Sequence, residues 1–101
     1  MKRYTGDRTM NGIQVLVDGE PLAPRFKLRM IAKNGFEWSY EGDEPNQLAL
    51  ALLADHLGDD SKALALYEGF MRRIVANFGN EWEMTGSDID TALANICADA
   101  A

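Results

Sequence analysis

The first half of the chain alternates between apolar and polar positions, which is the period of a β-strand. Ile13, Val15 and Val17 form one such run, and a turn signal follows at residues 18–19. Two more runs alternate on either side of residues 34–35: Phe26, Leu28 and Met30 before them, and Phe36, Trp38 and Tyr40 after them. The pattern therefore predicts three short strands between residues 13 and 41.

The Asn34-Gly35 pair sets the register of the second predicted hairpin. A two-residue turn would pair Met30 with Ser39 and mix apolar and polar side chains on one face. A three-residue loop, with Gly35 in the left-handed position of a bulge, pairs Met30 with Trp38 instead. We therefore predict the longer loop, a positive φ angle at Gly35 and a core position for Trp38.

The second half changes to a helical period of about 3.6 residues. Asp43 can cap a first helix that has Pro45 in its first turn, and residues 47–57 are apolar nearly all round. Gly58 fits the end of this helix. Such a helix is expected at the centre of the core.

Two further helices follow. Asp60 or Ser61 opens the second one, whose broad apolar stripe continues until Gly79 closes it. Ser87, with Asp90 three residues later, is a variant of the capping box and opens the third helix.

Together these patterns predict an α+β fold. Residues 81–84 lie between the last two helices and are predicted as a short edge strand. The expected architecture is a small antiparallel sheet of about three to four strands, mostly N-terminal, covered by about three helices.

Composition indicates one domain, residues 1–101, because 101 residues that are 47% hydrophobic suit a single core. The single cysteine, Cys97, cannot form an internal disulfide, so we expect a reducing compartment, the cytoplasm. The longest apolar run, residues 48–54, is too short to span a bilayer. The first residues lack the apolar region of a secretory signal, and no membrane partner is expected.

Charge is distributed unevenly along the chain. Residues 1–33 hold seven basic and three acidic side chains, whereas residues 34–101 hold three basic and thirteen acidic ones. The surplus of acidic side chains in residues 34–101 exceeds the number that helix capping uses, and it suits docking on a basic groove of a partner protein. The competing interpretation is an acidic surface that only keeps the protein soluble. The candidate partner-binding carboxylates are Asp43, Glu44, Asp55, Asp59, Asp60, Glu68, Glu81 and Glu83.

No motif carries strong catalytic information, so we predict no enzyme, no cofactor and no metal. One alternative is a small metal protein or enzyme built around Asp55, His56 and Asp59. Calcium and zinc sites need other spacings or more ligands. The preferred interpretation is that Asp55 and His56 lie near the exposed end of a helix and that Asp59 caps the next helix.

A second alternative is a nucleic-acid-binding module that uses the basic residues of the predicted N-terminal sheet. Stacking on bases and contact with phosphates need aromatic and basic side chains on one face, and the alternation separates them. We therefore do not expect direct nucleic-acid binding. The basic residues concerned are Arg25, Lys27, Arg29 and Lys33.

Four blocks of sequence together resemble a known family. They are Tyr4-Thr5-Gly6-Asp7-Arg8, Val15-Leu16-Val17-Asp18-Gly19, Gly35-Phe36-Glu37-Trp38-Ser39-Tyr40 and residues 47–59. Over residues 4–96 the chain is similar to a family of small domains of unknown function found in phages, plasmids, bacteria and haloarchaea.

This resemblance implies a genetic context, since the family brings no established activity. Small genes on mobile elements often encode antagonists of host defence, anti-CRISPR proteins among them. Charge and resemblance together favour a non-enzymatic protein that binds and inhibits or regulates a nucleic-acid-handling protein. An anti-CRISPR that mimics the charge of DNA and binds a CRISPR effector subunit is the specific form of this hypothesis.

Overall fold

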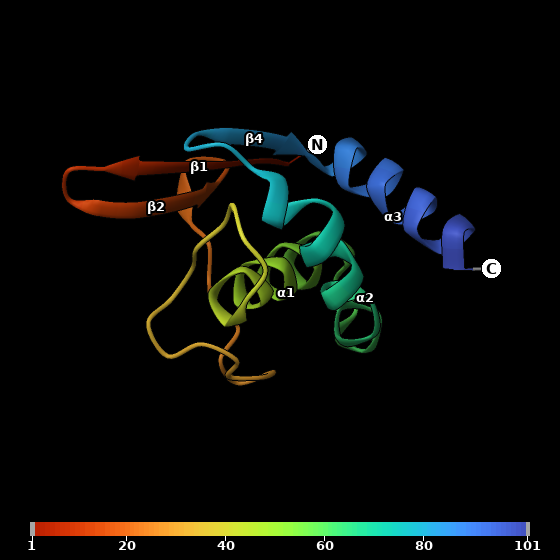
Figure 1. Cartoon of the computed structure of the whole chain (residues 1–101). Helices are drawn as coiled ribbons and strands as arrows, with labels where there is room; N and C mark the ends of the chain where they lie inside the picture. The colour runs from red at the N-terminus through yellow and green to blue at the C-terminus, as the bar shows by residue number, and fades with distance from the viewer. Residues whose placement is uncertain (1, 101) are drawn as a thin grey trace.

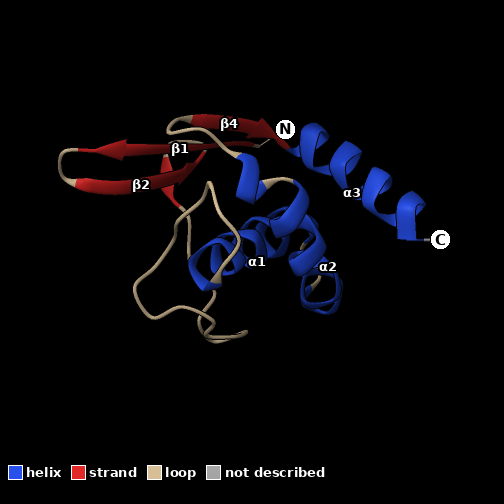
Figure 2. Cartoon of the chain, in the orientation of Figure 1, coloured by secondary structure: helices blue, strands red, loops and turns tan. Residues whose placement is uncertain are grey.

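A computed structural model of the chain describes residues 2–100 and shows an α+β architecture, as predicted. The strands of its four-stranded sheet form one layer, α1 and α2 pack beneath it, and α3 projects from the end of β4 (Figures 1 and 2). The elements in chain order are β1 (Arg3–Thr9), β2 (Gly12–Val17), β3 (Glu20–Pro21), α1 (Asp43–Leu57), α2 (Asp60–Arg73), the 3₁₀ helix η1 (Val75–Asn77), β4 (Trp82–Thr85) and α3 (Gly86–Ala100).

The sheet is antiparallel, with the spatial order β3-β2-β1-β4. β2 pairs along its whole length with residues 4–9 of β1, whereas β4 pairs with β1 only from Arg3 to Gly6. The far ends of β1 and β2 therefore extend as a two-stranded ribbon beyond the rest of the sheet (Figure 1). β4 lies at one edge, which confirms the edge strand predicted at residues 81–84 to within one residue.

The predicted hairpin around Asn34-Gly35 does not form. Residues 22–42 contain no strand, so the predicted strands after residues 25 and 35 and their Met30–Trp38 register are wrong. Gly35 does have a positive φ of 96°, but in a loop and not in a hairpin bulge. Trp38 is fully buried as predicted, whereas Met30 is 57% exposed and Tyr40 is 43% exposed.

A buried glutamine explains why this segment is a loop. The Gln47 Oε1 atom accepts hydrogen bonds from the backbone N–H groups of Ile31 (2.7 Å) and Ala32 (3.0 Å). Its Nε2 atom donates to the backbone carbonyls of Pro24 (2.6 Å) and Arg29 (3.1 Å). Buried backbone groups need partners, and here one side chain supplies what a strand ladder would otherwise supply.

The boundaries of the first two helices differ from the prediction at their ends. Gly42, and not Asp43, is the N-cap residue of α1, whereas Gly58 ends it with a left-handed φ of 63°, as expected. α2 ends at Arg73 and not at Gly79. The chain continues as η1, and the side chain of its last residue, Asn77, donates a hydrogen bond to the Arg73 carbonyl at the end of α2 (3.0 Å).

The capping pair of α3 lies two residues before the predicted one. The Thr85 hydroxyl accepts from the backbone N–H of Asp88 (3.1 Å), and the Asp88 carboxylate accepts from the backbone N–H of Thr85 (3.0 Å). This reciprocal pair is a capping box, so Ser87 and Asp90 do not form it.

An aromatic cluster joins the sheet to the helices. The ring planes of Trp38 and Trp82 meet edge to face with centroids 5.8 Å apart, and Phe78 stacks on Trp82 at 4.4 Å. Phe70 of α2 is fully buried, as predicted. Trp38 thus reaches the core from a loop and not from a strand.

Gly6 provides the space that this cluster needs, and replacing it should destabilise the fold. A Cβ atom at Gly6 would lie 2.2 Å from the Trp82 indole, which Trp38 and Phe78 hold in place. We expect Gly6→Ala to lower the free energy of unfolding by about 1–3 kcal/mol in chemical denaturation. Gly79→Ala is the control, because its Cβ would have no neighbour closer than 3.9 Å. Equal stability of the two variants would contradict the proposed packing.

Candidate functional site

The eight carboxylates predicted to bind a partner do not lie on one face. Asp43 and Glu44 begin α1, and Asp55 lies near its other end. A helix of 15 residues is about 22 Å long, so these two groups are well separated. The others are Asp59 and Asp60 at the start of α2, Glu68 on the exposed side of α2, and Glu81 and Glu83 at β4.

Asp55 is engaged in contacts within the protein. Its Oδ2 atom accepts hydrogen bonds from the Tyr4 hydroxyl (2.7 Å) and the Lys2 Nζ atom (3.1 Å). Its Oδ1 atom lies 3.6 Å from the Arg25 Nη2 atom. The side chain is only 14% exposed, so a partner would have to displace these contacts to reach it.

Because Tyr4 contacts Asp55, the free energy of unfolding is expected to change with pH in the alkaline range. Burial and the hydrogen bond to Asp55 raise the pKa of Tyr4 far above its ordinary value of 10.0. The unfolded chain therefore loses this proton near pH 10 while the folded protein keeps it, so the stabilisation is complete below about pH 10 and decreases above it.

We expect Tyr4 alone to lower the free energy of unfolding by about 1.4 kcal/mol for each pH unit above pH 10. Urea denaturation between about pH 8 and pH 11 measures this slope. Tyr4→Phe should show a smaller slope than the wild-type protein. An unchanged slope would contradict the role assigned to Tyr4.

The other predicted carboxylates have weaker contacts. Asp59 caps α2 by accepting from the backbone N–H of Lys62 (3.1 Å). Glu44 accepts from the Tyr40 hydroxyl (2.8 Å), and burial together with this bond raises the pKa of Tyr40 to about 12. Glu68 lies 4.0 Å from Arg72, a contact between exposed groups that contributes little to stability.

Glu81 and Glu83 begin a run of exposed acidic residues that continues into α3. Trp82 and Met84 are buried, and because side chains alternate along a strand, the two glutamates face outward. α3 follows β4 without a break and adds two exposed aspartates in its first turns. We call this set the β4–α3 surface; its residues are Glu81, Glu83, Asp88 and Asp90.

Few positive charges offset this surface. Arg3 lies 3.2 Å from Glu83, and the His56 Nε2 atom lies 2.6 Å from Asp90. Glu81 has no ion pair within residues 2–100. The two aspartates are not among the carboxylates predicted to bind a partner, although residues 74–101 hold five acidic and no basic side chains. That local imbalance is the signal that could have identified them.

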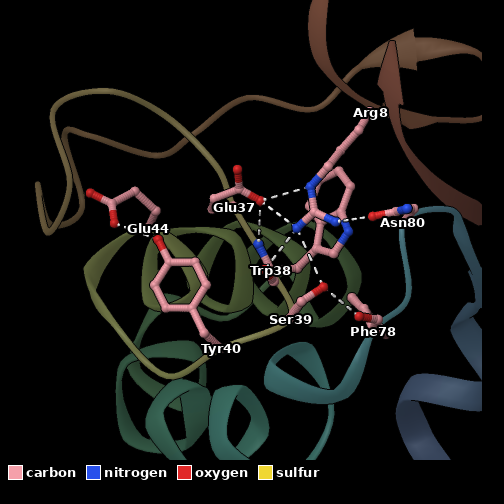
Figure 3. Close-up of polar contacts among 8 residues, drawn as sticks. All are labelled: Arg8, Glu37, Trp38, Ser39, Tyr40, Glu44, Phe78 and Asn80. Atoms are coloured by element: carbon pink, nitrogen blue, oxygen red, sulfur yellow. Dashed lines mark hydrogen bonds and ion pairs between the residues drawn. The ribbon is translucent and has the colours of Figure 1, made fainter.

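A second polar cluster surrounds Arg8 of β1 (Figure 3). Its guanidinium donates to the Glu37 carboxylate at 2.7 and 3.2 Å, and to the Trp38 carbonyl at 2.9 Å. It also donates to Asn80 at 2.6 Å and to Ser39 at 3.3 Å, and its Cζ atom lies 4.7 Å from the Trp38 ring centroid. These contacts are all internal, so the cluster fastens the long loop to the sheet.

The residues of the suggested metal site do not converge. Asp55 contacts Lys2 and Tyr4, His56 contacts Asp90, and Asp59 caps α2. Within the described part of the chain, no three His, Cys, Asp or Glu side chains form a group that could hold a metal ion.

The sheet face required for the nucleic-acid alternative is also missing, because residues 25–33 form a loop. Arg29 donates to the Tyr67 hydroxyl (3.2 Å) and Arg25 approaches Asp55, whereas Lys27 and Lys33 are exposed. The four basic residues therefore do not form the shared strand face that the alternation predicted.

Comparison with known protein families assigns the chain. Residues 4–95 match the Family of unknown function (DUF6166). The protein is a member of the DUF6166 family. No curated protein and no solved structure gives a significant match. Among residues 2–100 of this DUF6166 protein, no helix is long and apolar enough to cross a membrane. The blocks that carry the resemblance include Tyr4, Gly6, Arg8 and Trp38, which all make internal contacts.

Proposed function

We propose that this DUF6166 protein is a non-enzymatic, cytoplasmic regulator that binds a basic groove of a nucleic-acid-handling protein. The observation that carries the proposal is the β4–α3 surface, where four exposed carboxylates occur between the residue before β4 and the first turns of α3. A partner that binds nucleic acid presents Lys and Arg side chains, and a surface of opposite sign both steers and orients its association.

Rigid support strengthens this assignment. Glu81 and Glu83 alternate with Trp82 and Met84, whose burial in the core fixes the side of the chain from which both glutamate side chains project. The Thr85–Asp88 capping box fixes the start of α3 relative to β4. Because the backbone that carries these residues is ordered before binding, only side-chain freedom is lost when a partner docks.

The geometry favours the β4–α3 surface over the other predicted carboxylates. The turn between α1 and α2 presents its charges less openly: the Asp55 side chain is only 14% exposed and Asp59 is half-buried, whereas Glu83 and Asp90 are 51% and 67% exposed although each contacts one basic side chain. By occupying a nucleic-acid groove, the acidic surface would mimic the charge of DNA and inhibit the partner. In the setting of a mobile element, a CRISPR effector subunit is the first partner to test.

Charge reversal provides the test. We expect the double variant Glu81→Lys/Glu83→Lys to bind the partner about 100-fold more weakly, because like charges would then meet in the interface. The control is Asp43→Lys/Glu68→Lys, which changes net charge equally at exposed acids elsewhere and should have little effect. Association of the wild-type protein should slow as salt rises.

The partner is first identified by affinity capture from the native host, with wild-type protein and both variants as bait. Affinities for the purified partner are then measured by surface plasmon resonance at several salt concentrations. Competition between this protein and DNA for the partner supports the proposal. Retained binding by Glu81→Lys/Glu83→Lys would overturn it. Direct binding of DNA in a low-salt gel shift, lost on reversing Lys27 and Lys33, would support the nucleic-acid alternative instead.

A further inference from the structure

A cavity of about 580 Å³ opens between the start of the long loop and the first residue of α2. Its volume falls within the range of about 300–1,000 Å³ that is typical of small-molecule sites. In Figure 2 the loop is the long tan segment that leaves the sheet and passes α1. The lining residues are Ala23, Pro24, Arg25, Phe26, Lys27, Leu28 and Asp60.

The walls of this cavity combine apolar surface with two cations. Pro24, Phe26 and Leu28 contribute rings and a branched side chain, as is common in pockets that bind small organic molecules. Lys27 is exposed and forms no ion pair within residues 2–100. Arg25 lies 3.6 Å from Asp55, which offsets its charge, so Lys27 is the cation of the lining that is left to attract an anion.

The loop that forms the cavity is held in shape before any ligand binds. Gln47 donates to the carbonyls of Pro24 and Arg29 from the interior. The Arg25 carbonyl accepts hydrogen bonds from the backbone N–H groups of Leu28 (3.0 Å) and Arg29 (3.2 Å), so the lining residues 25–28 form a hydrogen-bonded turn. A preformed pocket loses less free energy on binding than one that must be ordered.

Arg25 is unusual in two further respects. Its φ of 63° is in the left-handed region, which residues with a Cβ atom rarely adopt. Its buried Nε atom has no hydrogen-bond partner in the described part of the protein. Unfavourable backbone geometry of this kind is concentrated at ligand-binding sites, where surrounding contacts maintain it.

From these observations we propose that the cavity binds a small amphipathic anion, with an aromatic or branched aliphatic body and one carboxylate. The body packs against Pro24, Phe26 and Leu28, and the carboxylate faces Lys27. This site is separate from the β4–α3 surface and does not depend on the proposed function.

Nuclear magnetic resonance titration of the ¹⁵N-labelled full-length protein tests the proposal with two matched probes. The probes are 2-naphthoate and the neutral 2-naphthalenemethanol. We expect saturable shifts of backbone amides in residues 22–28 and 60–62, and about tenfold tighter binding of the anion than of the neutral alcohol. Equal affinity for both probes, or no saturable shift at about 5 mM naphthoate, would overturn the proposal.

Variants with matched charge locate the binding site. Lys27→Glu should weaken naphthoate binding about tenfold and leave binding of the alcohol unchanged. Lys33→Glu changes the net charge equally in the same loop but outside the cavity, and should have little effect. Asp60→Asn should strengthen naphthoate binding. If both lysine variants weaken binding equally, the attraction is a general one and the assigned site is wrong.

Discussion

Replacing Trp38 with alanine should lower the free energy of unfolding by about 3–5 kcal/mol. The side chain is fully buried, its ring meets Trp82 edge to face, and Arg8 lies 4.7 Å from its centroid. Truncation removes the aromatic and cation–π contacts and leaves a cavity that the fixed backbone cannot fill. The carbonyl of the same residue accepts from Arg8, so the loop keeps that hydrogen bond.

Chemical denaturation followed by circular dichroism measures this loss. Tyr40→Ala is the matched control, because it removes an aromatic ring two residues away that is 43% exposed; it should lose less than about 1 kcal/mol. Phe70→Ala should resemble Trp38→Ala, since Phe70 is also fully buried. If Trp38→Ala is too unstable to purify, Trp38→Phe should give a smaller, measurable loss. A loss below about 1 kcal/mol in Trp38→Ala would contradict the packing.

The helices could be predicted from the sequence because their signal is local and long. The run from residue 47 to 57 is apolar nearly all round, and α1 is indeed buried from Gln47 through Ala54. Gly58 ends this helix as expected, because a single glycine is enough to adopt the left-handed conformation that stops a helix.

The loop of residues 22–42 could not be predicted, because its partners are distant. Alternation over five residues suits a strand, but it also arises when separate contacts direct single side chains inward. Trp38 is held by Arg8, 30 residues earlier, and the turn before it by Gln47. β1 itself gave no clear apolar alternation, since Gly6 and Arg8 occupy two of its inward positions.

Of the candidate site, only the negative sign of its charge could be predicted from the sequence. The acidic surplus of the second half is a property of composition, but the grouping of Glu81 and Glu83 with Asp88 and Asp90 follows from β4 running directly into α3. Asp55 shows the opposite case. Its engagement with Tyr4 spans 51 residues, which no spacing rule within α1 reveals.

Replacing Gln47 with glutamate should lower the free energy of unfolding by about 2–4 kcal/mol at neutral pH. The introduced oxygen takes the place of the Nε2 donor and faces the carbonyls of Pro24 and Arg29, so two acceptors lose their partner. The other oxygen can still accept from Ile31 and Ala32. The change is nearly isosteric, so the loss reports hydrogen bonding and charge and not packing.

The pH dependence of the Gln47→Glu variant separates the contribution of the lost hydrogen bonds from that of the introduced charge. Burial and the facing carbonyls favour the neutral form, so the folded-state pKa of the introduced carboxyl lies above its unfolded value of about 4.3. The deficit relative to the wild-type protein is therefore smallest below about pH 4.3 and grows as pH rises through the folded-state pKa. Gln14→Glu makes the same chemical change at an exposed position of β2 and should show no such dependence. A deficit for Gln47→Glu that stays constant between about pH 4 and pH 8 would mean that the side chain does not make these hydrogen bonds to the loop.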